Sequence, residues 1–132
     1  MRILLDSNAY SLLMRGQEQV ADLVRVADEL LFSAVVVGEL LYGFRRGSRF
    51  DQNAADLGSF LSSPFSTFVE VGPVTADRYS RIAAALRAIG RPIPTNDVWI
   101  AAHAMETGAD LVSADHHFEH VQGIVWTQIP AI

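Results

Sequence analysis

The sequence predicts an α/β fold in which helices flank a short, mainly parallel sheet of five strands. Short apolar runs alternate with longer segments whose apolar residues recur every three or four positions, as in strands that alternate with amphipathic helices. The 132 residues suffice for one domain with a single core, and 50% of them are apolar while 19% are charged. We therefore expect a single domain over residues 1–132, without repeats or linkers.

The first half of the chain contains two expected strands, each followed by helical segments. The expected elements, in order, are a strand at residues 2–5, a helix beginning near Ser7 or Asn8, an amphipathic helix over residues 17–31, a very short strand near residues 31–32, a helix capped by Ser33 that ends at Gly43 or Gly47, and a helix over residues 48–62. The first apolar run ends at Asp6, so this acid should lie at the carboxyl end of a strand.

The second half repeats the alternation and contains the clearest helical pattern. The expected elements are a strand at residues 66–71, a helix capped by Thr75 that ends at Gly90, an extended connector at residues 91–94, a helix capped by Thr95 or Asn96 that runs from residue 97 to 107, a strand at residues 109–113, and a last strand at residues 124–126. Asp97 then falls in a first helical turn, and Asp115 follows a strand.

Composition narrows the class of protein. The amino-terminal apolar run is interrupted by Asp6, so we expect neither a signal peptide nor a membrane span, and the absence of cysteine fits a cytoplasmic protein. The net charge is -5, yet all ten basic residues are Arg, whose planar group suits phosphate. Arg45, Arg46 and Arg49 form a local basic group that is either a nucleic-acid contact or a set of scattered solvated charges.

Four acids are best interpreted together. Ligands of a parallel sheet gather at the carboxyl ends of its strands, where Asp6 and Asp115 are expected. Asp97 and Glu39 lie near helix starts that can border the same mouth. Clustered carboxylates repel one another unless a divalent cation compensates them, and Mg²⁺ or Mn²⁺ bound there would support phosphodiester hydrolysis.

Each acid also has an ordinary explanation. Asp6 and Asp97 can serve as helix caps or first-turn acids, and Asp115 as a turn residue. Glu39 is harder to explain, because valine and leucine residues flank it and a partly buried carboxylate needs a partner, which an Arg could supply.

Two other chemistries have weaker sequence support. Zinc could bind among His103, His116, His117 and His120, but the chain has no Cys and no His-Glu-x-x-His helix, so surface or capping histidines are the preferred interpretation. Phosphorylation of Asp6 or Asp115 would lack both an Asp-x-Asp motif at the first strand and any Lys.

Four segments, in order, resemble those of PIN-domain ribonucleases, and among them the VapC toxins of type II (VapBC) toxin-antitoxin systems. They are LLDSN at 4–8, VGELLYG at 37–43, PTNDVWIAA at 94–102 and LVSADHHF at 111–118. The resemblance implies a three-layer α/β/α PIN fold and a Mg²⁺-dependent endoribonuclease, with Mn²⁺ as a substitute. Asp6, Asp97 and Asp115 would hold the metal, and Glu39 would help to bind it or orient the attacking water.

The resemblance also implies supporting residues and partners. Asn8 and Ser113 would support the metal site. If the substrate is single-stranded RNA, the chemistry of arginine makes Arg45 and Arg46 the expected RNA contacts. The partners would be a VapB-like antitoxin covering the acidic mouth, a second copy in a homodimer, and operator DNA through the antitoxin only. His116 and His117 stand where the family often has a further acid or Asn, so a second metal is not implied. An inactive binding module and a free-standing nuclease remain the alternatives.

Overall fold

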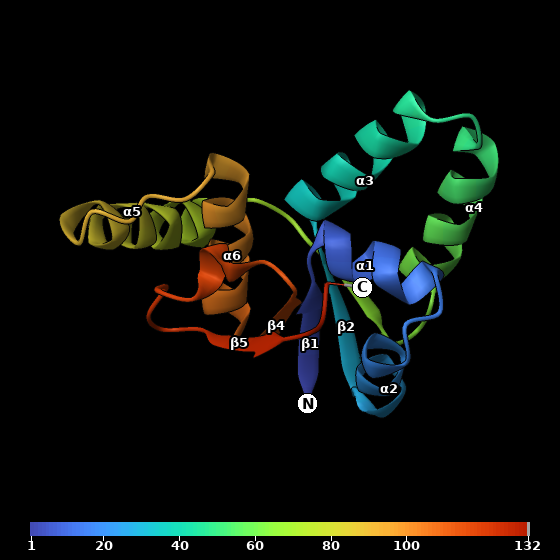
Figure 1. Cartoon of the computed structure of the whole chain (residues 1–132), viewed down its shortest axis with the longest axis horizontal. Helices are drawn as coiled ribbons and strands as arrows, with labels where there is room; N and C mark the ends of the chain where they lie inside the picture. The colour runs from blue at the N-terminus through green and yellow to red at the C-terminus, as the bar shows by residue number, and fades with distance from the viewer. Residues whose placement is uncertain (132) are drawn as a thin grey trace.

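The computed structural model describes residues 1–131 and contains one parallel sheet (Figure 1). Its strands are β1 (Arg2–Leu5), β2 (Glu29–Ser33), β3 (Ser66–Val69), β4 (Asp110–Ser113) and β5 (Val125–Gln128). They lie in the order β3-β2-β1-β4-β5, and every neighbouring pair is parallel. In this register Leu4 pairs with Leu31 of β2 and with Leu111 of β4. The predicted fold class is confirmed.

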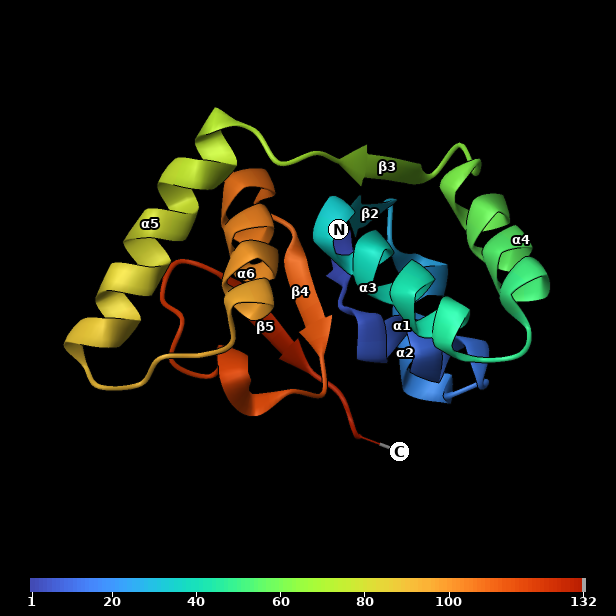
Figure 2. The ribbon, with the colours of Figure 1, turned by 90° about the horizontal axis from the view of Figure 1, so that it is seen from above.

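Helices connect the strands and cover the sheet. They are α1 (Ser7–Met14), α2 (Glu18–Val26), α3 (Ala34–Arg46), α4 (Phe50–Leu61), α5 (Pro73–Ala88) and α6 (Thr95–Thr107), with a 3₁₀ turn η1 (His116–Phe118) before β5. Figure 2 shows α5 and α6 on the opposite side of the molecule from α3 and α4. Among residues 1–131, no helix combines the length and the apolar character needed to cross a bilayer.

The strand order places a crevice between β1 and β4. From β1 the chain moves outward to β2 and β3, and then crosses by α5 and α6 to β4 on the other side of β1. Where the connections from two neighbouring strands run to opposite sides, a crevice opens at the carboxyl ends of those strands. Proteins with α/β folds bind their ligands in this crevice. The ends of β1 and β4 therefore define the expected binding region.

The inner residues of the middle strands are apolar because helices cover both faces of the sheet there. Ile3, Leu4 and Leu5 of β1 are at most 1% exposed, and Leu111 and Val112 of β4 are fully buried. Such continuous burial fixes the register of these strands, so the residues that follow them are held in defined positions.

A buried histidine fastens α6 to the rest of the fold. His103 is 0% exposed; its Nε2 lies 3.0 Å from the carbonyl oxygen of Glu70 and its Nδ1 lies 2.8 Å from Oγ of Ser33. Because a carbonyl only accepts, Nε2 carries the proton, and Nδ1 accepts from the Ser33 hydroxyl. Ser33 also caps α3, since its Oγ accepts from the backbone N–H of Val35 at 3.1 Å. The cap predicted for Ser33 is confirmed.

Several predicted boundaries were wrong. The helix expected over residues 17–31 ends at Val26, and Leu31 lies in β2. The chain turns extended at Ala27 (φ -70°, ψ 142°), and Asp28 then donates its backbone N–H to the Met1 carbonyl, which starts the strand pairing with β1. For α3 the second of the two predicted ends is confirmed, because the helix continues through Gly43 to Arg46 and Gly47 caps it.

Two helix starts also differ from the prediction. Thr75 is not the cap of α5, which begins at Pro73 after Gly72. Thr75 instead lies in the first turn, where its Oγ1 accepts from the backbone N–H of Gly72 at 3.0 Å and donates to Glu106 at 2.5 Å. The helix α6 begins at Thr95 with Pro94 at the cap position, so neither Thr95 nor Asn96 is a cap.

Candidate functional site

A polar hollow of about 450 Å³ lies at the carboxyl ends of the central strands. It is lined by residues from four separate stretches of chain: Asp6, Ser7, Asn8, Glu39, Pro94, Thr95, Asn96, Asp97 and Asp115. All four acids predicted for the metal site are among them. The fold thus brings together carboxylates that are up to 109 residues apart in the sequence, since Asp6 and Asp115 share this hollow.

Asp6 is the most deeply placed acid and is held rigidly. It follows β1 directly, is 5% exposed, and caps α1 by accepting from the backbone N–H of Ala9 at 2.8 Å. Its other oxygen accepts a hydrogen bond from the hydroxyl of Ser113, at the end of β4. The cap explanation considered for Asp6 is therefore correct, and it coexists with a place in the shared hollow.

Ser113 links two of the acids. Its buried Oγ donates to Asp6 and accepts from the backbone N–H of Asp115 at 2.9 Å. The β1–β4 pairing, with Leu5 opposite Val112, places these groups side by side. Ser113 thus occupies the supporting position expected for it, whereas Asn8 lines the hollow as an exposed residue.

Asp97 and Asp115 meet around the imidazole of His117, for which the sequence favoured a surface or capping role. Nδ1 of His117 lies 2.7 Å from Oδ2 of Asp97 and 3.1 Å from Oδ2 of Asp115. Within the described chain, this trio is the one group of three or more potential metal ligands whose donor atoms all lie within 4.8 Å of one another. The signal that could have identified His117 is its position two residues after an acid at a strand end.

Glu39 lies on α3 and faces the hollow from the opposite wall. Its Oε1 accepts from the Ser7 hydroxyl at 3.1 Å, and its Oε2 accepts from the Asn96 side-chain amide at 3.3 Å. Neutral donors thus supply the partners that a partly buried carboxylate needs. An Arg, the partner considered from the sequence, does not fill this role: among residues 1–131, no ion pair joins an Arg to any of the four acids.

Burial and mutual repulsion shift the proton affinities of two acids. Burial raises the pKa of Asp6 to about 6, against hydrogen bonds from Ser113 and Ala9 that lower it, and the charges of Asp97 and Asp115 raise it further. Burial also raises the pKa of Asp97, while the hydrogen bond with His117 opposes this shift. The hollow is therefore short of positive charge, which is what a divalent cation supplies.

The donor set suits a hard divalent cation. Carboxylate oxygens are the preferred ligands of Mg²⁺ and Mn²⁺, and one imidazole is compatible with Mn²⁺. Asp97 and Asp115 each offer a carboxylate oxygen close to a ring nitrogen of His117, and Asp6 and Glu39 line the same hollow. The residues present therefore fit a metal centre.

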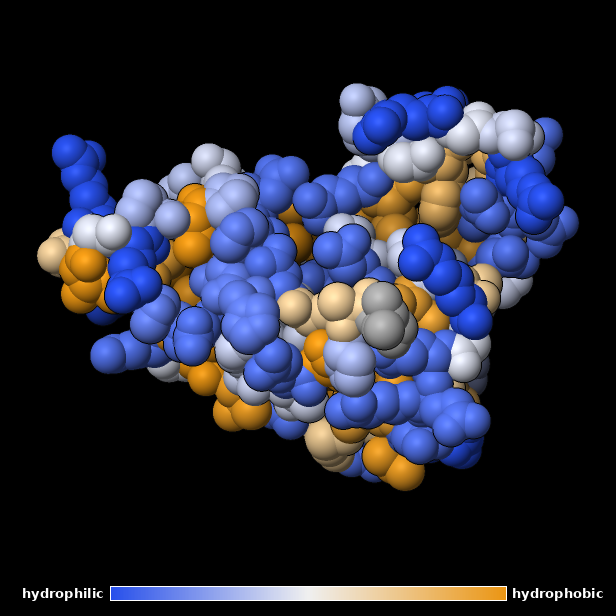
Figure 3. Space-filling view, in the orientation of Figure 1, coloured by the Kyte–Doolittle hydropathy of each residue, from blue (hydrophilic) through white to orange (hydrophobic). Residues whose placement is uncertain are grey.

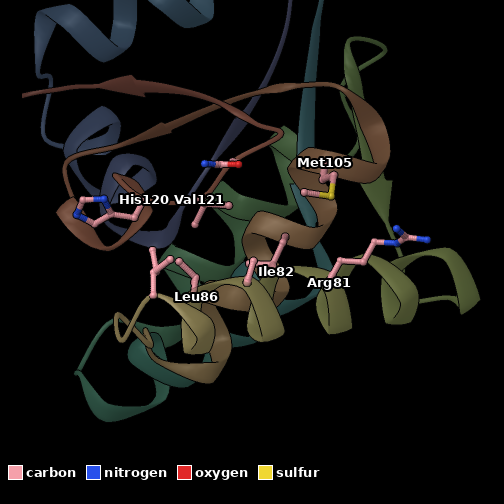
Figure 4. A pocket seen from close by; sticks show the side chains of 9 residues that line it. Arg81, Ile82, Leu86, Met105, His120 and Val121 are labelled. Carbon is pink, nitrogen blue, oxygen red and sulfur yellow. The ribbon is translucent and has the colours of Figure 1, made fainter.

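The remaining histidines do not form a second centre. His103 is a core residue, His116 contacts Gln128 and the ring of Trp126, and His120 lies 3.8 Å from Glu119. His120 also borders an apolar hollow of about 300 Å³ between α5 and the segment after η1, where Ile82, Leu86, Met105 and Val121 point inward (Figure 4). The structure does not gather the four histidines as the zinc hypothesis required.

The two predicted RNA contacts lie on the same helix as Glu39 but outside the hollow. Arg45 and Arg46 occupy the last turn of α3 and are exposed. The guanidinium of Arg45 lies 4.2 Å from the centroid of the Phe50 ring, and that of Arg46 lies 5.6 Å from the centroid of the Tyr42 ring. Six or seven residues of α-helix separate them from Glu39, a rise of about 10 Å.

Comparisons with known proteins agree with this geometry. The profile of the PIN domain matches residues 3–124, so the chain belongs to the PIN-domain family. Ribonuclease VapC2 of Haemophilus influenzae is 32% identical over 124 residues, which make up 92% of each chain. Within the PIN domains, the chain therefore groups with the VapC ribonucleases.

Several solved structures of similar fold are VapBC complexes. VapBC2 of Rickettsia felis, bound to a DNA fragment from its promoter, has a TM-score of 0.87 with 22% identity and covers 98% of this chain and 99% of its own. VapBC-1 of nontypeable Haemophilus influenzae has a TM-score of 0.85 with 25% identity and covers 97% of this chain and 98% of its own. These likenesses establish the shared fold over nearly the whole chain.

Proposed function

We propose that this chain is a divalent-metal-dependent endoribonuclease and the toxin of a VapBC-type toxin-antitoxin pair. One observation carries the nuclease proposal: four carboxylates from distant stretches line a single hollow, and no Arg among residues 1–131 forms an ion pair with them. Membership of the VapC group supports RNA as the substrate.

Mg²⁺ is the proposed ion, with Mn²⁺ as a substitute, and Asp6, Asp97 and Asp115 would hold it. When bound, the ion would lower the pKa of a water and stabilise charge on a phosphoryl oxygen. Glu39, held by Ser7 and Asn96, would orient the attacking water and accept a proton from it. Attack on phosphorus breaks the bond to the 3′ oxygen, which takes up a proton, and leaves a 5′-phosphate and a 3′-hydroxyl.

The end of α3 supports the binding of single-stranded RNA. Tyr42 is 65% exposed, and Arg45 and Arg46 lie beside it in an otherwise acidic protein. Unpaired bases stack on exposed aromatic rings and guanidinium planes, while Arg contacts phosphate. We therefore assign RNA contacts to this turn, about 10 Å along the helix from Glu39.

Two surface hollows support an antitoxin partner. One, of about 240 Å³, is lined by residues of α1, α3 and α4, among them Tyr10, Met14 and Phe44, and apolar surface is visible there in Figure 3. The other, of about 300 Å³, lies between α2 and α4 and includes Val24 and Phe60. We propose that an antitoxin segment occupies this surface, that the toxin is a cytoplasmic homodimer, and that operator DNA is bound through the antitoxin only.

Cleavage of single-stranded RNA by the purified full chain tests the enzymatic proposal. We expect cleavage with Mg²⁺ or Mn²⁺, loss with EDTA, and recovery on adding excess metal. Asp97→Asn should abolish cleavage, whereas Asp51→Asn, which changes an exposed acid on α4, should not. Absence of RNA cleavage under every metal condition would favour a binding module without catalysis.

Expression in a host cell tests the toxin role separately. We expect growth arrest that Asp97→Asn prevents and that co-expression of a small DNA-binding protein encoded beside this gene relieves. RNA cleavage without growth arrest, or without such a neighbouring gene, would indicate a free-standing nuclease.

A further inference from the structure

The imidazole of His117 lies against two of the four acids. Its Nδ1 is 2.7 Å from Oδ2 of Asp97 and 3.1 Å from Oδ2 of Asp115. Two ligand atoms at adjacent corners of an octahedron, each about 2.1 Å from the ion, are about 3.0 Å apart. Both distances from Nδ1 are close to this value, and Asp97, Asp115 and His117 each offer a ligand atom within 4.8 Å of the others.

The local backbone holds the imidazole in this position. Asp115 caps η1, and its Oδ1 accepts from the backbone N–H of His117 at 2.9 Å. That contact leaves Oδ2 of Asp115 directed at the His117 ring. Since Ser113 fixes the backbone of Asp115 through a further hydrogen bond, both ligands are positioned by the same short turn after β4.

The neighbouring histidine has a different environment. Nε2 of His116 lies 3.0 Å from Nε2 of Gln128, and its ring packs edge-on against Trp126 at a centroid distance of 5.5 Å. Among residues 1–131, no hydrogen bond or ion pair joins His116 to any of the four acids. His116 and His117 thus form a matched pair, identical in chemistry and adjacent in sequence.

We propose that Nδ1 of His117 is a ligand of the divalent ion, together with Asp97 and Asp115, and that this nitrogen shifts the selectivity of the site from Mg²⁺ toward Mn²⁺. The inference rests on the proposed metal-dependent function. Both ions favour oxygen ligands, but Mn²⁺ is a transition-metal ion that is softer than Mg²⁺, so exchanging one oxygen ligand for an imidazole nitrogen costs Mn²⁺ less affinity than it costs Mg²⁺. For Nδ1 to donate its lone pair, Nε2 carries the ring proton, and the half-exposed ring allows water to accept from it.

Pulsed electron paramagnetic resonance of the Mn²⁺-loaded full chain tests this ligand without any catalytic readout. A bound imidazole couples the ¹⁴N nucleus to the Mn²⁺ electrons, and carboxylates give no such coupling. We expect ¹⁴N coupling in the wild type and in His116→Asp, and its loss in His117→Asp, which supplies an oxygen ligand in place of nitrogen. Circular dichroism checks that the variants are folded.

Calorimetric titrations with Mn²⁺ and Mg²⁺ give the second readout. The ratio of Mn²⁺ to Mg²⁺ affinity should fall about tenfold or more in His117→Asp, within the range by which ligand-shell changes alter metal affinity, and should stay unchanged in His116→Asp. His117→Asn, which retains a hydrogen-bond donor toward Asp97, should lower the ratio as well, because the nitrogen ligand is lost.

The alternative is that His117 is only a hydrogen-bond partner of Asp97. The proposal would be overturned if the wild type showed no ¹⁴N coupling, if the coupling survived in His117→Asp, or if it were lost in His116→Asp. It would also be overturned by an unchanged ratio of Mn²⁺ to Mg²⁺ affinity in His117→Asp, or by a wild type that binds no Mn²⁺. Metal-dependent RNA cleavage without ¹⁴N coupling would refute the proposal that His117 is a ligand and leave the proposed ribonuclease function standing. Coupling without any RNA cleavage would support the ligand and refute the ribonuclease.

Discussion

Replacing Asp6 by Asn should stabilise the metal-free protein while destroying its proposed activity. In the fold, burial raises the pKa of Asp6 from its ordinary value of 3.8 to about 6. A shift of about 2 pKa units corresponds to about 3 kcal/mol of destabilisation when the carboxyl is ionised at neutral pH. Asn removes that charge and can keep the hydrogen bond from Ala9, but it fits Ser113 less well. We expect the free energy of unfolding of the metal-free protein to rise by about 1–3 kcal/mol.

The pH dependence gives the sign of the effect. Because the folded state raises the pKa of Asp6, the protonated form is favoured in the fold, and stability is lost as the pH rises from 3.8 to about 6. The difference in the free energy of unfolding between Asp6→Asn and the wild type should therefore be small near pH 4 and reach its full value above pH 6. Urea unfolding in EDTA, followed by circular dichroism between pH 4 and 7.5, measures it.

Asp22→Asn is the control for this experiment. Asp22 pairs with Arg25 on the surface, where both side chains are at least 65% exposed, so its replacement should change stability by less than about 1 kcal/mol. If Asp6→Asn were no more stable than the wild type at pH 7.5 in EDTA, the assignment of Asp6 as a buried, uncompensated charge would be refuted.

Four further substitutions test other parts of the structure. His103→Leu should lower the free energy of unfolding by about 1–3 kcal/mol, because Ser33 and Glu70 lose their hydrogen-bond partner. Burial lowers the pKa of His103, so the wild type should lose stability as the pH falls below 6.5. Urea titrations should show that His103→Leu lacks this loss. Gly108→Ala should destabilise by about 1 kcal/mol, since Gly108 has φ 72°, whereas Gly58→Ala within α4 should stabilise by about 0.5–1 kcal/mol; thermal unfolding distinguishes a loss from a gain. Arg46→Ala should weaken RNA binding in filter-binding assays and reduce its salt dependence, and equal affinity in both proteins would exclude this contact.

Much of the fold could be predicted because local patterns and the sheet agree. The apolar run of β1 ends at Asp6, and the strand does end there. The helix predicted over residues 17–31 was too long because Leu31 continues the helical spacing, although its partners are Leu4 and Thr67 in a sheet. Pairing between distant strands decides such a boundary, and a local pattern does not contain it.

The site was predicted less completely than the fold. The four acids could be chosen because each lies at a strand end or near a helix start, and the structure places them around one hollow. Their partners could not be predicted: Ser7 and Asn96 hold Glu39, and His117 joins Asp97 to Asp115. These contacts depend on side-chain directions at the meeting of several elements, which spacing along the chain does not specify.

Anomalous diffraction from crystals soaked in Mn²⁺ is the most direct test of a shared metal site. We expect a Mn²⁺ peak bounded by Asp97 and Asp115, with Asp6 and Glu39 on the same hollow, and its disappearance in Asp97→Asn crystals treated identically. A peak elsewhere on the protein, or none in this hollow at saturating Mn²⁺, would contradict the metal-dependent mechanism.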